Sequence, residues 1–104
     1  MEKRISDPVA YRIIEPEENS GANYRIEILI GRATQQSGGE FACELQIFGV
    51  GDWDAKPHKM SGNDSYQTIE IAMQFAETRI RDSEIGSVID PFWMKNAYSV
   101  DAEV

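Results

Sequence analysis

Residues 41–80 constrain the fold of this chain more than any other stretch. The first eight, FACELQIF, place Phe41, Cys43, Leu45 and Ile47 on one face and polar residues opposite, as in a β-strand with one buried side. A glycine-marked turn (GVGDW) and a short basic run (KPHK) follow. The remainder, GNDSYQTIEIAMQFAETRI, has apolar residues three and four positions apart, the spacing of an amphipathic helix. This order predicts an α+β domain.

Two alternating stretches precede this unit and one irregular stretch follows the turn. Residues 9–14 and 24–31 both have the pattern of strands, and residues 33–40 (ATQQSGGE) predict a flexible hairpin loop. A fourth strand is expected at residues 55–60. Because Pro57 has no backbone N–H to donate, this strand belongs at the edge of the sheet.

The helix is expected to start at Asn63 or Asp64 and to end before Gly86. Asp64 with Gln67 three residues later is close to a capping box, and Gly86 suits the C-terminal end. One face collects the apolar residues Ile69, Ala72, Met73, Ala76 and Ile80, widened by Phe75, and the opposite face collects Glu70, Glu77 and Arg81. The sequence therefore predicts a four-stranded antiparallel meander with one long helix packed on one face.

A short C-terminal segment completes the domain. Phe92, Trp93 and Tyr98 would bury substantial area if they docked. The chain is expected to form one small domain over residues 1–104, with residues 101–104 frayed.

The charge balance limits the partners. Lys and Arg number 10 and Asp and Glu number 18, so the formal net charge is −8. This argues against nucleic acid, which is bound largely through basic faces, and against anionic membranes. A basic protein partner would be attracted. The simpler interpretation, that the charge keeps the protein soluble, is favoured.

Three further features of the sequence indicate the cellular compartment of the protein. No apolar run approaches the roughly 20 residues that span a bilayer, and MEKRISDPVAYR lacks the apolar core of a secretory signal. The single cysteine, Cys43, permits no intramolecular disulfide, which agrees with a reducing compartment. A soluble cytoplasmic protein is predicted.

Catalytic chemistry has few candidates. His58 is the only histidine and stands between Pro57 and Lys59, so an exposed edge-strand position is favoured over a base or metal ligand. Cys43 shares its strand face with apolar residues, which favours an unreactive core thiol over a nucleophile. Gly49 and Gly51 lack the context of a phosphate loop. We expect no enzyme, no cofactor and no metal site.

Binding has two candidate locations. In the first, Asp52, Trp53 and Asp54 form a turn, where a Trp53 folded onto the core is favoured over an exposed protein-binding residue. In the second, Leu29 and Phe48 point outward, together with Ile14, on the nominally polar face of the sheet. Cover by the Phe92–Trp93 segment is the favoured outcome there, and an open interface is the alternative.

Nine residues suggest a family: Phe41, Cys43, Gly49, Gly51, Gly62, Asp64, Ser65, Gln67 and Ala72. Their pattern, an F-x-C strand, a G-x-G-D turn and a G-x-D-S-x-Q helix start, resembles a family of short bacterial domains of unknown function. The likeness covers residues 26–80, with Thr68 standing where the family often has alanine. It implies the strand–turn–helix core and carries no activity, cofactor or site residue.

Three functions remain, in this order. The first is a protein-interaction module, most concretely an inhibitor or immunity-type protein that blocks a basic partner. The second is a self-associating structural or accessory domain, with a homodimer as its simplest form. The third is an enzyme or small-ligand carrier, which the scarcity of catalytic groups disfavours.

Overall fold

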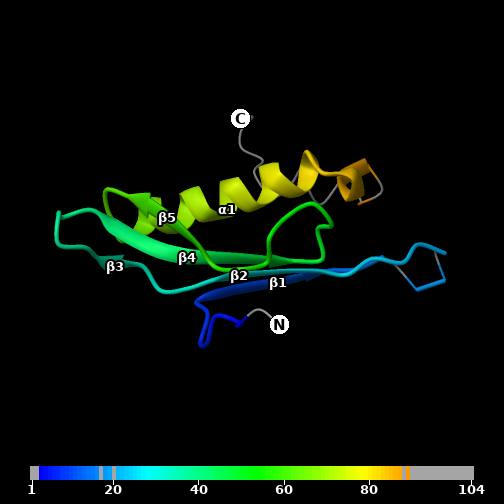
Figure 1. Ribbon diagram of the computed structural model, residues 1–104, viewed down its shortest axis with the longest axis horizontal. Coiled ribbons are helices and arrows are strands. Elements are labelled where there is room, and N and C mark those ends of the chain that lie inside the picture. The colour runs from blue at the N-terminus through cyan, green and yellow to red at the C-terminus, as the bar shows by residue number, and fades with distance from the viewer. Residues whose placement is uncertain (1–2, 17, 20, 88, 90–104) are drawn as a thin grey trace.

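The computed structural model describes residues 3–16, 18–19, 21–87 and 89. In this part of the chain five strands form one antiparallel sheet, and one long helix lies along one face of it (Figure 1). The elements are β1 (Ala10–Ile14), β2 (Ile26–Ile30), β3 (Thr34–Gln35), β4 (Phe41–Phe48), β5 (His58–Gly62), α1 (Ser65–Arg81) and the short 3-10 helix η1 (Glu84–Ser87). The predicted α+β class and antiparallel sheet are confirmed.

The sheet has one strand more than predicted. β4 pairs with both β2 and β3 along one side and with β5 along the other, and β1 pairs with β2. β3 lies within the predicted hairpin loop of residues 33–40, where Thr34 pairs with Ala42 and Gln35 with Phe41. Gln36 N–H then donates to Glu40 O at 2.7 Å and closes a tight turn. The hairpin is therefore ordered closer to its tip than its composition indicates.

The last strand begins later than predicted, at His58 instead of residue 55. The Asp54 carboxylate accepts a hydrogen bond from the backbone N–H of Lys56 at 3.0 Å, which folds these residues into a turn. Pro57 consequently stands just before β5, and among the described strands β5 pairs only with β4, at the predicted edge position.

The start of α1 follows its sequence signal and its end does not. Asp64 is the N-cap and its carboxylate accepts from the backbone N–H of Gln67 at 2.7 Å, while the Gln67 side chain accepts from the N–H of Asn63. The helix ends with Asp82 as C-cap, and Gly86 lies within η1. Ser83 accounts for the early end, because its hydroxyl and its N–H both donate to the carbonyl of Ile80.

The hydrophobic core lies between α1 and the sheet face that points toward it. The sheet contributes Ile14, Ile26, Ile28, Ile30, Cys43, Leu45 and Ile47, and the helix contributes Ala72, Ala76 and Ile80. Ile14 pairs with Ile26 and shares this inner face, so the prediction that it points outward is wrong. A continuous apolar face on both layers explains why the helix packs here.

The helix face is rotated from the expected one. Met73 and Phe75 are 46% and 37% exposed, whereas Glu77, expected on the solvent side, is 2% exposed. Glu77 forms an ion pair with Arg81, one helical turn further on, at 3.2 Å. Burial raises the pKa of Glu77, and Arg81 partly opposes this.

The predicted C-terminal segment with Phe92, Trp93 and Tyr98, and the predicted frayed residues 101–104, lie outside the described residues.

Candidate protein-binding site

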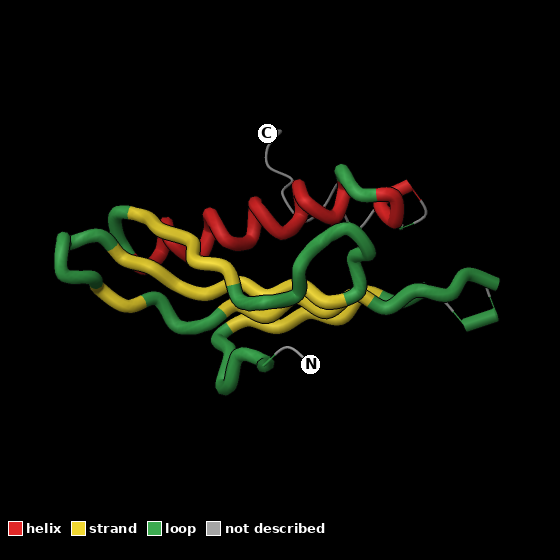
Figure 2. Tube along the Cα trace, in the orientation of Figure 1, coloured by secondary structure: helices red, strands yellow, loops and turns green. Residues whose placement is uncertain are grey.

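The outer face of the sheet, which points away from α1, carries the N-terminal segment of the chain. We define the N-terminal segment as residues 3–7, which lie across the sheet on the side opposite to α1 (Figure 2). The strand registers place the following side chains on the outer face: Tyr11, Ile13, Glu27, Leu29, Gln46 and Phe48. Three of them, Gln46, Glu27 and Phe48, hold the segment.

Gln46 binds the backbone of the N-terminal segment. Its side chain is fully buried. The Oε1 atom accepts from the N–H of Ile5 at 2.8 Å, and the Nε2 atom donates to the carbonyl of Lys3 at 2.7 Å and to that of Ala55 at 2.9 Å. The side-chain amide of Gln46 thus pairs with the backbone of the segment as a neighbouring strand would. These hydrogen bonds do not depend on which side chains the segment carries.

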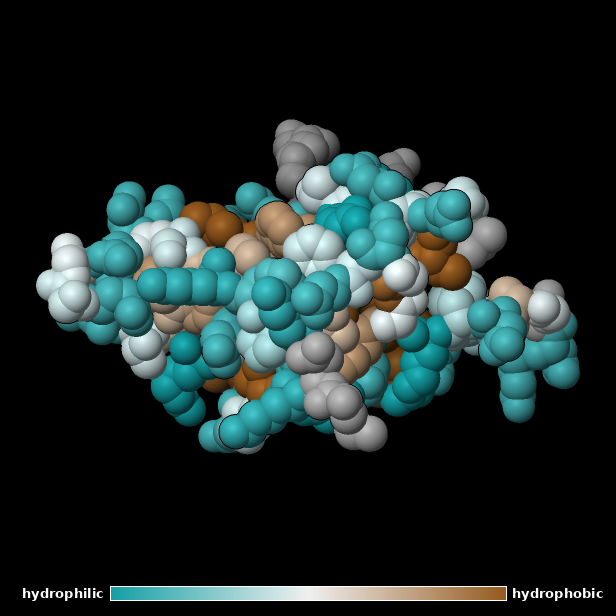
Figure 3. Space-filling model, in the orientation of Figure 1, coloured by the Kyte–Doolittle hydropathy of each residue, from teal (hydrophilic) through white to brown (hydrophobic). Residues whose placement is uncertain are grey.

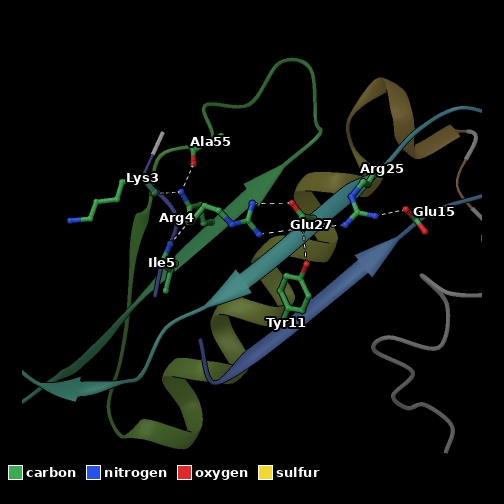
Figure 4. A network of polar contacts seen from close by, with 9 residues as sticks. Lys3, Arg4, Ile5, Tyr11, Glu15, Arg25, Glu27 and Ala55 are labelled. Carbon is green, nitrogen blue, oxygen red and sulfur yellow. Dashed lines mark hydrogen bonds and ion pairs between the residues drawn. The ribbon is translucent and has the colours of Figure 1, made fainter. Parts of the chain in front are cut away.

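Glu27 and Phe48 bind the side chain of Arg4. Its guanidinium donates to both carboxylate oxygens of Glu27, at 3.0 and 3.2 Å (Figure 4). Its central carbon lies 4.7 Å from the centroid of the Phe48 ring. Tyr11 donates to Glu27 at 2.6 Å and fixes the carboxylate. The two parallel bonds and the stacked ring match the planar fork of arginine, which lysine lacks. We call Gln46, Glu27 and Phe48 the arginine receptor.

The hydrogen bonds around Glu27 stabilise the ionised form of its carboxylate. Hydrogen bonds from Arg4 and then from Tyr11 lower the pKa of Glu27 from its ordinary value of 4.5, and the nearby Arg25 acts in the same direction. Arg25 in turn pairs with Glu15, so four charged groups and one phenol form a continuous network (Figure 4).

The network predicts a pH-dependent stability. Because the pKa of Glu27 is lower in the folded than in the unfolded chain, its contribution is complete above about pH 4.5 and is lost as the pH falls through the folded-state value. We expect Glu27→Gln to lower the free energy of unfolding by about 1 kcal/mol at neutral pH. The wild type should lose stability more steeply than the variant as the pH falls from about 5 to below 4.5. Urea titrations across this range test it, and parallel curves would contradict it.

The two outward apolar residues predicted from the sequence are covered. Leu29 is 2% exposed and Phe48 is half-buried beneath Arg4. Within the described residues these two side chains do not form an open apolar surface, and Arg4 of the N-terminal segment lies over Phe48. The predicted cover, residues 92–93, lies outside the described residues.

The turn formed by Asp52, Trp53 and Asp54 is built inward. Trp53 packs against the core, with His58, Phe75 and Arg79 around its ring at 4.5, 5.7 and 5.1 Å. Asp52 pairs with Arg79 at 3.1 Å, and Asp54 with Lys56 at 3.9 Å. Cations of the same chain thus offset both carboxylates. Because the ring of Trp53 is packed against the core, this turn is a weaker candidate than the outer face for binding a partner.

Neither predicted chemical candidate is arranged for catalysis in the described residues. Cys43 is buried in the core, where burial raises the pKa of its thiol and the charge of Glu44 adds to the effect. The ring of His58 stacks on Trp53, with its Nε2 atom 3.1 Å from the carbonyl of Asp54. In the described part of the chain, no three or more His, Cys, Asp and Glu side chains gather as a metal site would need.

Comparison with known proteins gives a family and no function. A family model described as a domain of unknown function (DUF6968) matches residues 10–96. No curated protein and no solved structure matches the chain. Within the described residues, no helix combines the length and apolar character that crossing a membrane requires.

Proposed function

We propose that this chain, which belongs to the DUF6968 family of unknown function, is a protein-interaction module. It uses the outer face of its sheet to bind an extended, arginine-bearing segment of a basic partner. The observation that carries the proposal is the arginine receptor. It holds the backbone of Lys3 and Ile5 through Gln46 and the guanidinium of Arg4 through Glu27 and Phe48. The N-terminal segment therefore shows which groups the outer face binds, namely an extended backbone and one guanidinium.

The surface around the receptor supports the proposal. Tyr11 and Ile13 lie on the same outer face and are 50% and 40% exposed. A partner can therefore make apolar contacts with these two residues that the N-terminal segment does not make. The partner needs such additional contacts, because the segment it displaces is tethered in the same chain. Hydrophilic side chains cover most of the molecular face in Figure 3, and the net charge of −8 attracts a basic chain.

The mechanism is steric occlusion, as in an inhibitor or immunity-type protein. In this proposal the chain works in the bacterial cytoplasm, uses no catalytic step and acts by covering the basic surface of its partner. Long-range attraction raises the association rate and makes it fall as salt is added.

A test uses the full chain with only the guanidinium of Arg4 removed from the receptor, while Gln46 still binds the backbone of the segment. In Arg4→Ala the receptor loses its own arginine, and a synthetic peptide of the sequence MEKRISDP supplies one in trans. We expect calorimetry to show binding that weakens at least about tenfold when the peptide arginine is lysine, or when the protein also carries Glu27→Gln. Equal binding of both peptides would contradict the arginine receptor.

The partner itself is sought by capture from the native lysate. Wild type should retain a basic protein that excess MEKRISDP peptide releases, and Glu27→Gln should retain much less of it. Identical proteins on both baits, with no release by the peptide, would count against the proposed function.

The alternative is a self-associating structural or accessory domain. One observation favours it: the segment that occupies the outer face joins β1 through a tight connection whose backbone is strained, at Asp7.

A further inference from the structure

The connection between the N-terminal segment and β1 is short and strained. Residues 6–8 reverse the chain between the outer face and the sheet, visible as the sharp turn before β1 in Figure 1. Asp7 has a φ of 55°, in the left-handed region that L residues disfavour. Because Pro8 follows, its ring further restricts the backbone of Asp7. The segment reaches its own receptor only through this unfavourable conformation.

The contacts of the segment do not require that it belong to the same chain. Arg4 binds Glu27, 23 positions away, and Ile5 binds Gln46, 41 positions away. Both partners lie on a rigid sheet whose side chains a second copy presents identically. A segment held by distant contacts and joined by a strained hinge is the usual condition for exchange between copies.

The order of the strands provides a route for the exchange. Among the described strands β1 is an edge strand, paired with β2 alone. If two copies pair their β1 strands antiparallel about a two-fold axis, the Ala10 end of one β1 meets the Ile14 end of the other. Ile13 pairs with Glu27, so the partner's Glu27 then lies about two strand spacings, roughly 10 Å, from Ala10. The partner's Gln46 lies one strand further on, roughly 17 Å from Ala10. The five residue steps from Ala10 to Ile5, fully extended, span roughly 17 Å, so the segment reaches the partner's receptor when residues 5–9 are extended.

We propose that residues 3–7 exchange between two copies of the chain, so that the Arg4 of each copy binds the Glu27 of the other in a closed two-fold dimer. The turn at residues 6–8 opens, Arg4 and Ile5 bind the same partner residues on the other copy, and the edges of the two β1 strands cover each other. The occupant of the outer face is then a second copy, so this inference stands apart from the proposed function, which needs a foreign partner.

The first measurement is the mass of the wild-type protein in solution. Native mass spectrometry and light scattering should show a species of twice 11.7 kDa that grows with concentration. Asp7→Gly relieves the strained hinge in the monomer without touching a receptor residue, and we expect it to raise the dimer dissociation constant about tenfold. A mass of 11.7 kDa at every concentration, or a dimer that Asp7→Gly leaves unchanged, would overturn the exchange.

The second measurement separates exchange from any other dimer. Arg4→Glu and Glu27→Arg each place like charges in the receptor, so each variant alone should be mainly monomeric. Mixed, they restore opposite charges only across the two chains, and a heterodimer of one copy each should form, with circular dichroism confirming that both variants are folded. No heterodimer from two folded variants would overturn the proposal. The two proposals can fail separately. If the wild type is a dimer but the Arg4→Ala variant binds no MEKRISDP peptide, the exchange is supported and the proposed binding of a foreign partner is contradicted.

Discussion

Replacing Ile26 by alanine is expected to lower the free energy of unfolding by about 2–5 kcal/mol. Ile26 is fully buried at the start of β2, opposite Ile14 and within the core beneath α1. The substitution removes buried methyl groups and leaves a cavity that the regular sheet backbone cannot close by moving inward. Urea denaturation followed by circular dichroism measures the loss.

The matched control is Ile13→Ala in the neighbouring strand. Ile13 has the same side chain in the same sheet, but it lies on the outer face and is 40% exposed. Less buried surface is lost, so we expect a change below about 1 kcal/mol. Equal losses at the two positions would mean that the inner and outer faces are assigned wrongly.

Gly49→Ala is expected to cost about 3 kcal/mol or more, from backbone strain combined with a collision. The φ of Gly49 is 94°, which L residues rarely adopt. A Cβ atom there would also lie 2.0 Å from the carbonyl oxygen of Arg25. Because that oxygen belongs to the backbone next to β2, the clash cannot be relieved by turning a side chain.

Gly51 offers the control two residues further on. A Cβ atom at Gly51 meets no atom within 4 Å, so Gly51→Ala should change the free energy of unfolding by no more than about 0.5 kcal/mol. The same denaturation measurement compares the two variants. Similar, small effects would show that the turn after β4 tolerates a side chain and adopts another backbone conformation.

The parts of the fold predicted from sequence are those set by local chemistry. The alternation along residues 41–48 placed Cys43 and Leu45 inward, and Asp64 caps α1 as its position before the apolar pattern indicates. Ile14 was misplaced because an apolar residue at the end of a strand fits either face until its partner Ile26 fixes the register. Glu77 was misplaced because its burial depends on tertiary packing, while its charge alone indicates solvent.

The candidate site was harder to predict than the fold, since its parts are distant in sequence. Gln46 has an outward position in the alternating pattern, which on composition alone indicates a solvated side chain. Its burial follows from contacts with Lys3 and Ile5, more than 40 positions earlier. Leu29 and Phe48 gave the one usable signal: apolar residues on a polar face require a cover. Nothing local identified that cover as the N-terminal segment.

The connectivity of the sheet also sets an order of events in folding. Three of the four strand pairs join strands that follow each other along the chain, and β2 pairs with β4 across the short hairpin that contains β3. The sheet can therefore form through short loops at low entropic cost. The N-terminal segment needs β1, β2 and β4 in place before Arg4 and Ile5 find their partners. We therefore expect its contacts to form after the rate-limiting barrier, so that weakening them accelerates unfolding while the folding rate stays nearly constant. In this scheme the arginine receptor binds the N-terminal segment to a sheet that is already folded. Its contacts then determine how long the segment stays bound to the outer face.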